Sequence, residues 1–144
     1  MGTRSATVFI DNEWDGHEPQ ELCVLYRQFD GYLSGHGKEL KEFLDGMEIV
    51  NGMTGREGPK YANGAGCLAA QVVAHFKMGH SGQFYIYPPG NRQLYTYFVS
   101  AKSKQPLHLR VEYCLYQKPP RLVYDGPLSA FDPEMELPPA ESES

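Results

Sequence analysis

The stretch that decides the fold class is Leu107-His108-Leu109-Arg110-Val111-Glu112-Tyr113-Cys114-Leu115-Tyr116. Apolar residues occupy every second position from Leu107 to Leu115, and the residues between them are polar as far as Glu112. This alternation, with a period of two, indicates a β-strand that has one face in the core and the other toward solvent. Half-buried strands of this kind are typical of antiparallel sheets, because parallel sheets are buried on both faces.

Other segments on both sides of this strand also have the composition of β-strands. Ten Tyr and seven Phe against one Trp favour strands, since aromatic rings suit a pleated, half-buried surface. The strands that we predict besides 107–116 are 7–10, 21–29, 84–87, 93–101 and a short last strand at 122–124.

Two segments between the second and third strands have helical periodicity instead. In 38–47, Leu40, Phe43, Leu44 and Met47 recur at i, i+3, i+4 and i+7, which predicts one apolar helix face. A second helix is predicted over 64–77, with apolar residues at every fourth position from Leu68. The stretch 48–63 between the helices contains three glycines and one proline, and we predict a long loop there.

The resulting order, β-β-α-α-β-β-β with one more short strand, predicts an α+β fold. We expect an antiparallel sheet of about five to six strands, with two helices packed on one face. A length of 144 residues fits one domain, which we place at residues 1–131. Residues 132–144 have three prolines, four Glu and no aromatic residue, so we expect a disordered acidic tail.

The overall charge argues against nucleic acid as the partner. The formal net charge is −5, whereas phosphate binding needs clustered Lys and Arg. Arg110, Lys118 and Arg121 form at most a local basic patch, and the acidic total favours a solvated sheet edge over a nucleic-acid site there. Without a segment resembling a signal peptide or a membrane span, we expect a cytoplasmic protein that does not contact membranes.

The cysteine and histidine residues lack the spacing of a metal site. Cys23, Cys67 and Cys114 each lie in an apolar run, and no Cys-x-x-Cys pair occurs. Buried free thiols are the expected state, and neither a metal nor a cofactor is predicted. A site made by His17, His75 and His108 stays open as an alternative, although no i, i+4 pair supports it.

The most informative segment for function is Phe29-Asp30-Gly31-Tyr32, followed by Gly35, Gly37 and Leu40. This motif resembles an uncharacterised family of small phage and mobile-element (gene-cassette-type) proteins, with the pattern Phe-Asp-Gly-Tyr-x-x-Gly-x-Gly-x-x-Leu. Many members have His where this chain has Gln28, and Pro where it has Leu33. The resemblance covers about twenty residues and implies a mobile-element setting, but no activity.

Two interpretations of this strand-to-helix turn remain open. In the structural one, Asp30 accepts backbone N–H groups, Gly31 takes a positive φ and Tyr32 packs over the helix. In the functional one, the turn holds a small ligand or an anion, because N–H groups at a helix start point outward. The candidate binding residues are Arg27, Asp30, Tyr32, His36, Lys38 and His80. An acid/base role for Asp30 with His36 or His80 is the weakest option, since no nucleophile is placed beside them.

The tyrosine-rich strands provide the leading hypothesis for function. One helix-covered face leaves a second sheet face to cover, and tyrosine-rich patches mark protein interfaces. We therefore expect a non-enzymatic binding or assembly protein of a mobile element, a homodimer through an aromatic sheet face or an edge strand. The candidate interface residues are Tyr85, Tyr87, Tyr95, Tyr97 and Tyr116. Ordinary cross-strand pairing of these rings within one sheet is the alternative.

Overall fold

The computed structural model describes residues 2–14, 16–52, 58–79 and 81–138. In chain order, the elements are β1 (Ser5–Asp11), β2 (Gln20–Arg27), a π-helical turn η1 (Leu33–Gly37), α1 (Lys38–Leu44), β3 (Glu48–Val50), β4 (Tyr61–Asn63), α2 (Gly64–Lys77), β5 (Phe84–Tyr87), β6 (Tyr95–Ala101), β7 (His108–Tyr113), β8 (Arg121–Pro127) and a 3-10 turn η2 (Leu128–Ala130).

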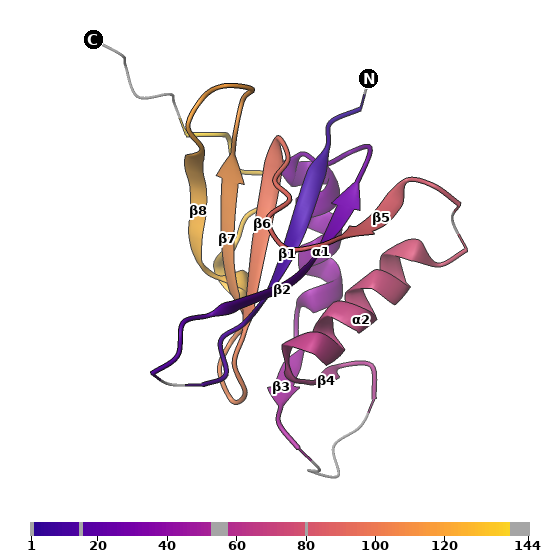
Figure 1. Cartoon of the computed structure of the whole chain (residues 1–144), viewed down its shortest axis with the longest axis vertical. Helices are drawn as coiled ribbons and strands as arrows, with labels where there is room; N and C mark the ends of the chain where they lie inside the picture. The colour runs from indigo at the N-terminus through magenta and orange to yellow at the C-terminus, as the bar shows by residue number, and fades with distance from the viewer. Residues whose placement is uncertain (1, 15, 53–57, 80, 139–144) are drawn as a thin grey trace.

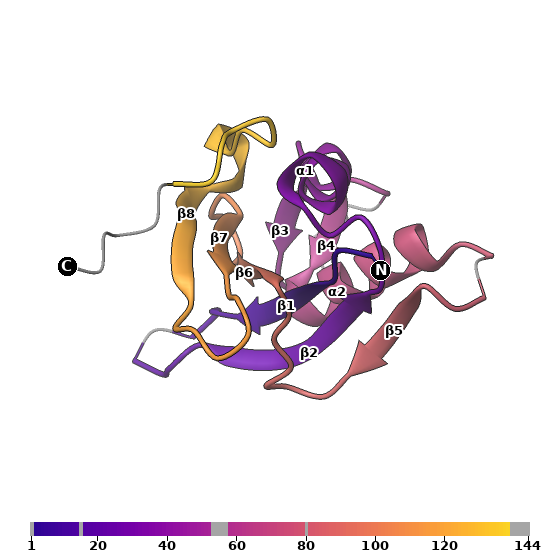
Figure 2. The same ribbon diagram turned by 90° about the horizontal axis from the view of Figure 1, so that it is seen from above.

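Six strands form one curved sheet in the order β5-β2-β1-β6-β7-β8 (Figures 1 and 2). Neighbouring strands are antiparallel, except that β1 and β6 are parallel. Both helices lie on the same face of this sheet, as the view from above shows (Figure 2). The predicted α+β fold, with about five to six strands and two helices on one face, is confirmed.

The core lies between this sheet face and the helices. It takes the inward side chains of the strands, such as Phe9, Leu25 and Val99, and the apolar stripes of α1 and α2, such as Leu40 and Leu68. The period-two and period-3.6 patterns of the sequence therefore converge on one cluster. No helix in the described part of the chain has the length and apolar character to cross a membrane.

The opposite face of the sheet is covered at its centre by the chain itself. Because β5 and β6 run in the same direction on opposite sides of the β1–β2 pair, the connection 88–94 crosses that face (Figures 1 and 2). Arg92 on this connection pairs with Glu21 at 2.7 Å, and its guanidinium carbon lies 4.9 Å from the centre of the Phe98 ring. Val8 and Val24 below it are fully buried. The expected open face is therefore exposed only toward its edges.

The predicted loop 48–63 contains a small second sheet. Its two ends, β3 and β4, pair in parallel, with Ile49 opposite Ala62. Both of these residues are buried in the core, which explains the pairing: each three-residue strand contributes one inward apolar side chain. Residues 53–57 of this stretch lie outside the described residues.

The segment predicted as a disordered tail begins with ordered structure. Phe131 is buried, and Met135 and Leu137 pack against the core. A turn at Asp132 positions them, since the backbone N–H of Met135 donates to the carbonyl of Asp132 at 3.1 Å. Ordered packing therefore continues past residue 131 as far as these side chains, while 139–144 lie outside the described residues.

The Tyr97 hydroxyl links the sheet to the turn that precedes α1. It donates to the carbonyl of Gly31 at 2.7 Å, and its side chain is fully buried. We expect Tyr97→Phe to lower the free energy of unfolding by about 1–2 kcal/mol, because the Gly31 carbonyl loses a buried donor. Tyr124→Phe is the matched control: its hydroxyl also donates to a carbonyl, that of Pro127, at an exposed position. Urea unfolding tests the pair, and an equal loss in both variants would contradict the structural role of Tyr97.

Candidate functional site

The turn between β2 and α1 is shaped by close contact as much as by backbone freedom. Asp30, rather than Gly31, takes the positive φ of 59°, and its carbonyl accepts the N–H of His36 at 2.7 Å. Asp tolerates this left-handed conformation better than most residues. Gly31 is needed for space: a Cβ there would lie 2.7 Å from the Cβ of Ser5 on β1. The prediction that Gly31 takes a positive φ is therefore wrong: a glycine is needed here because a side chain would collide with β1.

The π-helical turn η1 points His36 into the core. Gly37 allows this approach, because a Cβ there would lie 3.2 Å from the Tyr97 hydroxyl. The His36 ring is fully buried, with its centre 5.0 Å from the Phe76 ring and 5.1 Å from the Tyr97 ring. Its Nε2 lies 2.6 Å from the Thr7 hydroxyl oxygen, and its Nδ1 lies 3.2 Å from Nη1 of Arg27.

These contacts determine the protonation state of His36. A guanidinium only donates hydrogen bonds, so Nδ1 must be the acceptor and Nε2 carries the proton. Nε2–H then donates to the hydroxyl of Thr7. Burial, and secondarily the positive charge of Arg27, lower the pKa of His36 from 6.5 to about 3. His36 is therefore a neutral structural partner of Arg27 and not a general acid or base at neutral pH.

Arg27, at the end of β2, is a charged side chain within the core region. Its residue is 5 % exposed, and its guanidinium carbon lies 5.9 Å from the centre of the Phe76 ring and 5.2 Å from that of Phe84. Nη1 donates to Glu39 Oε2 as well as contacting His36. Glu39 is half-exposed, so the buried cation is neutralised by a carboxylate that still reaches solvent.

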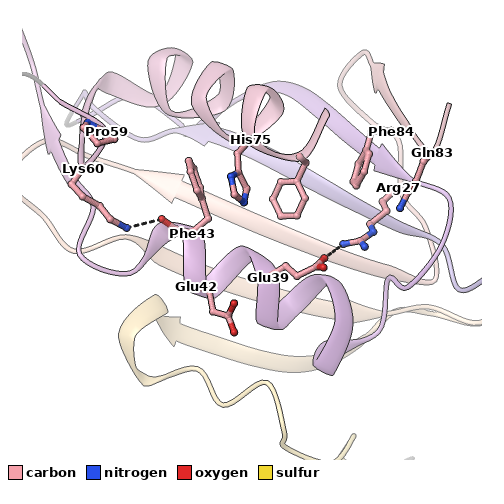
Figure 3. A pocket seen from close by; sticks show the side chains of 10 residues that line it. Arg27, Glu39, Glu42, Phe43, Pro59, Lys60, His75, Gln83 and Phe84 are labelled. Atoms are coloured by element: carbon pink, nitrogen blue, oxygen red, sulfur yellow. Dashed lines mark hydrogen bonds and ion pairs between the residues drawn. The ribbon is translucent and has the colours of Figure 1, made fainter. Parts of the chain in front are cut away.

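The Arg27–Glu39 pair lies at one end of a hollow between α1, α2 and the start of β5 (Figure 3). The hollow has a volume of about 740 Å³, within the range of small-molecule sites. Its apolar wall includes Phe43 and His75, whose rings stack with centres 4.2 Å apart. Lys60 closes the far end by donating to the carbonyls of Phe43 and Asp45, at 3.0 and 2.8 Å (Figure 3).

The candidate residues of the turn are therefore separated by the fold. Arg27 and His36 come together in the interior, whereas Asp30, Tyr32 and Lys38 are exposed on the surface. The Tyr32 hydroxyl reaches only the Asp30 carboxylate, at 3.4 Å. His80 lies outside the described residues. Within the turn, the N–H groups of Gly35 and Gly37 donate to the carbonyl of Tyr32, and that of His36 donates to the carbonyl of Asp30, so these three are not available to an anion.

The five candidate tyrosines also occupy different places. Tyr85 and Tyr87 are exposed on β5, on the face opposite the helices, where both contact the ring of Tyr26. Tyr95 and Tyr97 are buried on the core face, because β6 turns its odd-numbered residues toward the helices. These two rings therefore lie in the core of the chain and not on an open sheet face. Tyr116 is exposed in the β7–β8 connection, four strands away from β5 in the sheet order.

Several residues of the hollow were not singled out from the sequence. Glu39 belongs to no motif in the sequence, and Phe76 and Phe84 lie within the predicted helix 64–77 and the predicted strand 84–87. Thr7 gave one signal: it is polar in the run Thr7-Val8-Phe9-Ile10 and faces the core. A polar side chain at an inward position of a strand needs a buried partner, which here is His36. Within the described residues, no three His, Cys, Asp or Glu side chains are grouped to hold a metal ion.

The low pKa of His36 makes stability depend on pH in a defined direction. Below its ordinary pKa of 6.5 the unfolded chain binds a proton at this position, and the folded chain does so only near pH 3. The free energy of unfolding should therefore decrease as the pH is lowered. His36 alone should account for a decrease of about 1 kcal/mol between about pH 7 and pH 5.5. Urea unfolding at several pH values measures this change in the free energy of unfolding. In His36→Gln, the part of the change that is due to His36 should be absent. An imidazolium signal for His36 in ¹⁵N NMR at pH 5.5 would contradict the assignment.

The Glu39 carboxylate should contribute more to stability than its neighbour Glu42, one turn later on α1. Glu39→Gln leaves the buried Arg27 without a counter-charge, and we expect a loss of about 1–2 kcal/mol, moderated by the exposure of this carboxylate. Glu42→Gln should change stability by less than about 0.5 kcal/mol. Thermal and urea unfolding of both variants test this difference, which equal stabilities would refute.

Comparison of the chain with family models, with curated proteins and with solved structures yields no match. Its function is therefore argued from the geometry of the hollow and of the β5 edge.

Proposed function

We propose that this chain is a non-enzymatic binding protein that assembles into a homodimer through the edge strand β5. The observation that carries the proposal is the sequence of that edge, Phe84-Tyr85-Ile86-Tyr87, which has no charged residue and exposes three large side chains. Exposed apolar edges are templates for pairing with another chain, and proteins that stay monomeric block them.

The opposite edge of the sheet has the features of a blocked edge. Strand β8 carries Arg121 and Asp125 and ends at Pro127. Asp125 is held in a charged cluster, 2.6 Å from His108 Nε2 and 3.2 Å from Arg110 Nη1. Charges and proline are common protections of a free edge. This contrast favours β5 over β8 as the pairing edge.

The peptide groups of β5 have a suitable orientation for pairing. The N–H of Gln28 donates to the carbonyl of Gln83 at 2.9 Å, so the backbone groups of Gln83 point toward β2. Those of Tyr85 and Tyr87, two and four residues later, point the same way. Antiparallel ladders alternate in direction, so the N–H and C=O of Ile86 turn away from β2, toward the free edge. In the described part of the chain, Lys77 covers the start of the strand, where its Nζ donates to the carbonyls of Gly82 and Phe84.

A second copy of the chain is the partner that fits this edge. Two β5 strands related by a two-fold axis would pair antiparallel around Ile86, which makes the interface self-complementary. The neighbouring Tyr85 and Tyr87 rings, supported by Tyr26, would add apolar contact on the far face. The resemblance of the Phe29–Leu40 segment to small phage and mobile-element proteins gives the setting in which we propose that this assembly acts.

The solution mass of two matched variants tests the proposal. Ile86 is 55 % exposed on β5, and Leu122 is 48 % exposed on β8. We expect light scattering to give twice the 16.2 kDa of one chain for the wild type and for Leu122→Lys. Ile86→Lys should give a folded monomer, because it places a charge at the centre of the pairing edge.

Circular dichroism of each variant must show that the fold is kept. A monomeric wild type at micromolar concentration would overturn the homodimer. A dimer that survives Ile86→Lys but is lost in Leu122→Lys would move the interface to the opposite edge and would equally overturn the role of β5.

A further inference from the structure

An apolar groove with a volume of about 430 Å³ lies between the first half of β2 and α2. Leu22 and Cys23 form its β2 side, and its α2 side is lined by Gly66, Ala69, Ala70, Val73 and Ala74. From Gly64 to Ala74 the sequence contains no charged residue. A groove with this lining offers apolar contact rather than hydrogen bonds, so it suits an apolar side chain.

The groove opens beside the β5 edge. Because β5 pairs with residues 24–27 of β2, residues 20–23 have no strand next to them on the side away from β1 in the described part of the chain. His75 of α2 turns toward α1, where it stacks on Phe43, and the groove lies on the other flank of α2. α2 and β5 accordingly lie along the same side of the molecule (Figures 1 and 2). The groove therefore continues the surface that β5 begins.

β5 alone is too short to supply a stable interface. It has four residues, whereas a specific interface buries about 800 Å² and about 20 to 30 residues on each partner. The homodimer proposed above therefore needs further contact next to this edge. The adjoining groove can supply that contact twice, since a two-fold axis repeats every contact between the two copies.

The two-fold pairing determines which part of the second copy lies at the groove. In an antiparallel pair centred on Ile86, residue 84 of one copy lies opposite residue 88 of the other, and the residues before 84 lie beyond the end of β5. That place is beside the free part of β2, because Tyr87 at the end of β5 pairs with Val24. The residues before β5 form the connection from α2, which ends at Lys77. The C-terminal end of α2 in the second copy therefore comes to the groove of the first.

Met78 presents an exposed apolar side chain at this end of α2. It directly follows Lys77, and it is 70 % exposed. Methionine side chains are flexible and fill irregular apolar spaces. The groove has room for one, since a Cβ added at Gly66 would meet no atom of the described residues within 4 Å.

We propose that the groove between β2 and α2 receives Met78 of a second copy of this chain. The inference rests on the homodimer proposed above and adds to its β5 pairing a second contact on the helix side of the sheet. By symmetry, each copy inserts Met78 into the groove of the other.

Cross-linking tests whether Met78 and the groove meet. Cys23 lines the groove, so a short bismaleimide should join Met78→Cys to Cys23 of the second copy. A covalent dimer of twice 16.2 kDa should appear on a denaturing gel, and mass spectrometry should locate its link at residues 23 and 78. Tyr116→Cys is the matched control, because this side chain is 89 % exposed on the β7–β8 connection and should give no link to Cys23.

Met78→Glu tests what the contact contributes to the affinity between the copies. We expect the dissociation constant of the dimer to rise at least about tenfold, because a carboxylate would enter an apolar groove. Tyr116→Glu should leave the constant unchanged. Sedimentation equilibrium of the full chain measures both variants, and circular dichroism checks that each keeps its fold.

A dimeric wild type in which Met78→Cys gives no link to Cys23 overturns this contact, and so does an unchanged dissociation constant in Met78→Glu. In both cases a monomeric Ile86→Lys variant still supports the β5 homodimer, which then stands without the groove. A link from Tyr116→Cys to Cys23 that forms as readily as that from Met78→Cys equally overturns the contact. A monomeric wild type overturns the homodimer and the contact together, and the solution mass identifies that case.

Discussion

One buried positive charge organises the helical side of this fold. Arg27 ends β2, and through Nη1 it contacts His36 of the π-helical turn and Glu39 of α1, while its guanidinium lies between rings of α2 and β5. Removing a guanidinium from water is expensive, so these partners must all be in place once the charge is inside. The side chain of Arg27 therefore links β2 to the nearby turn and α1 and to the more distant α2 and β5. It also gives the inward histidine of the turn a partner.

The burial of Arg27 also explains why His36 is not suited to acid/base catalysis. His36 satisfies Arg27 only as a neutral acceptor, and the fully buried ring has a pKa near 3. Its other nitrogen is committed to Thr7. A histidine that is held in one protonation state supports a structure rather than a proton transfer.

The sequence predicted the parts of the molecule that follow from local periodicity. The alternation over 107–116 and the i, i+4 spacing from Leu68 both correspond to elements that bury the expected faces. It could not predict which face of β6 meets the helices, because Tyr95, Tyr97 and Val99 alternate with Thr96 and Phe98 and both sets are apolar enough for a core. The β3–β4 pair was also beyond reach, since three-residue strands carry no measurable period. The contact of Arg27 with His36 depends on a π-helical turn and on Gly37 lying against Tyr97, which no spacing in the sequence encodes.

The most direct measurement of the central claim is the exchange rate of the Arg27 Nε proton in ¹⁵N-¹H NMR. A buried guanidinium held between Phe76 and Phe84 predicts a resolved Nε–H signal that exchanges slowly with water and shows NOEs to both rings. Rapid exchange, with no NOE to either ring, would place the Arg27 side chain in solvent. The charge would then not organise the helical side of the fold.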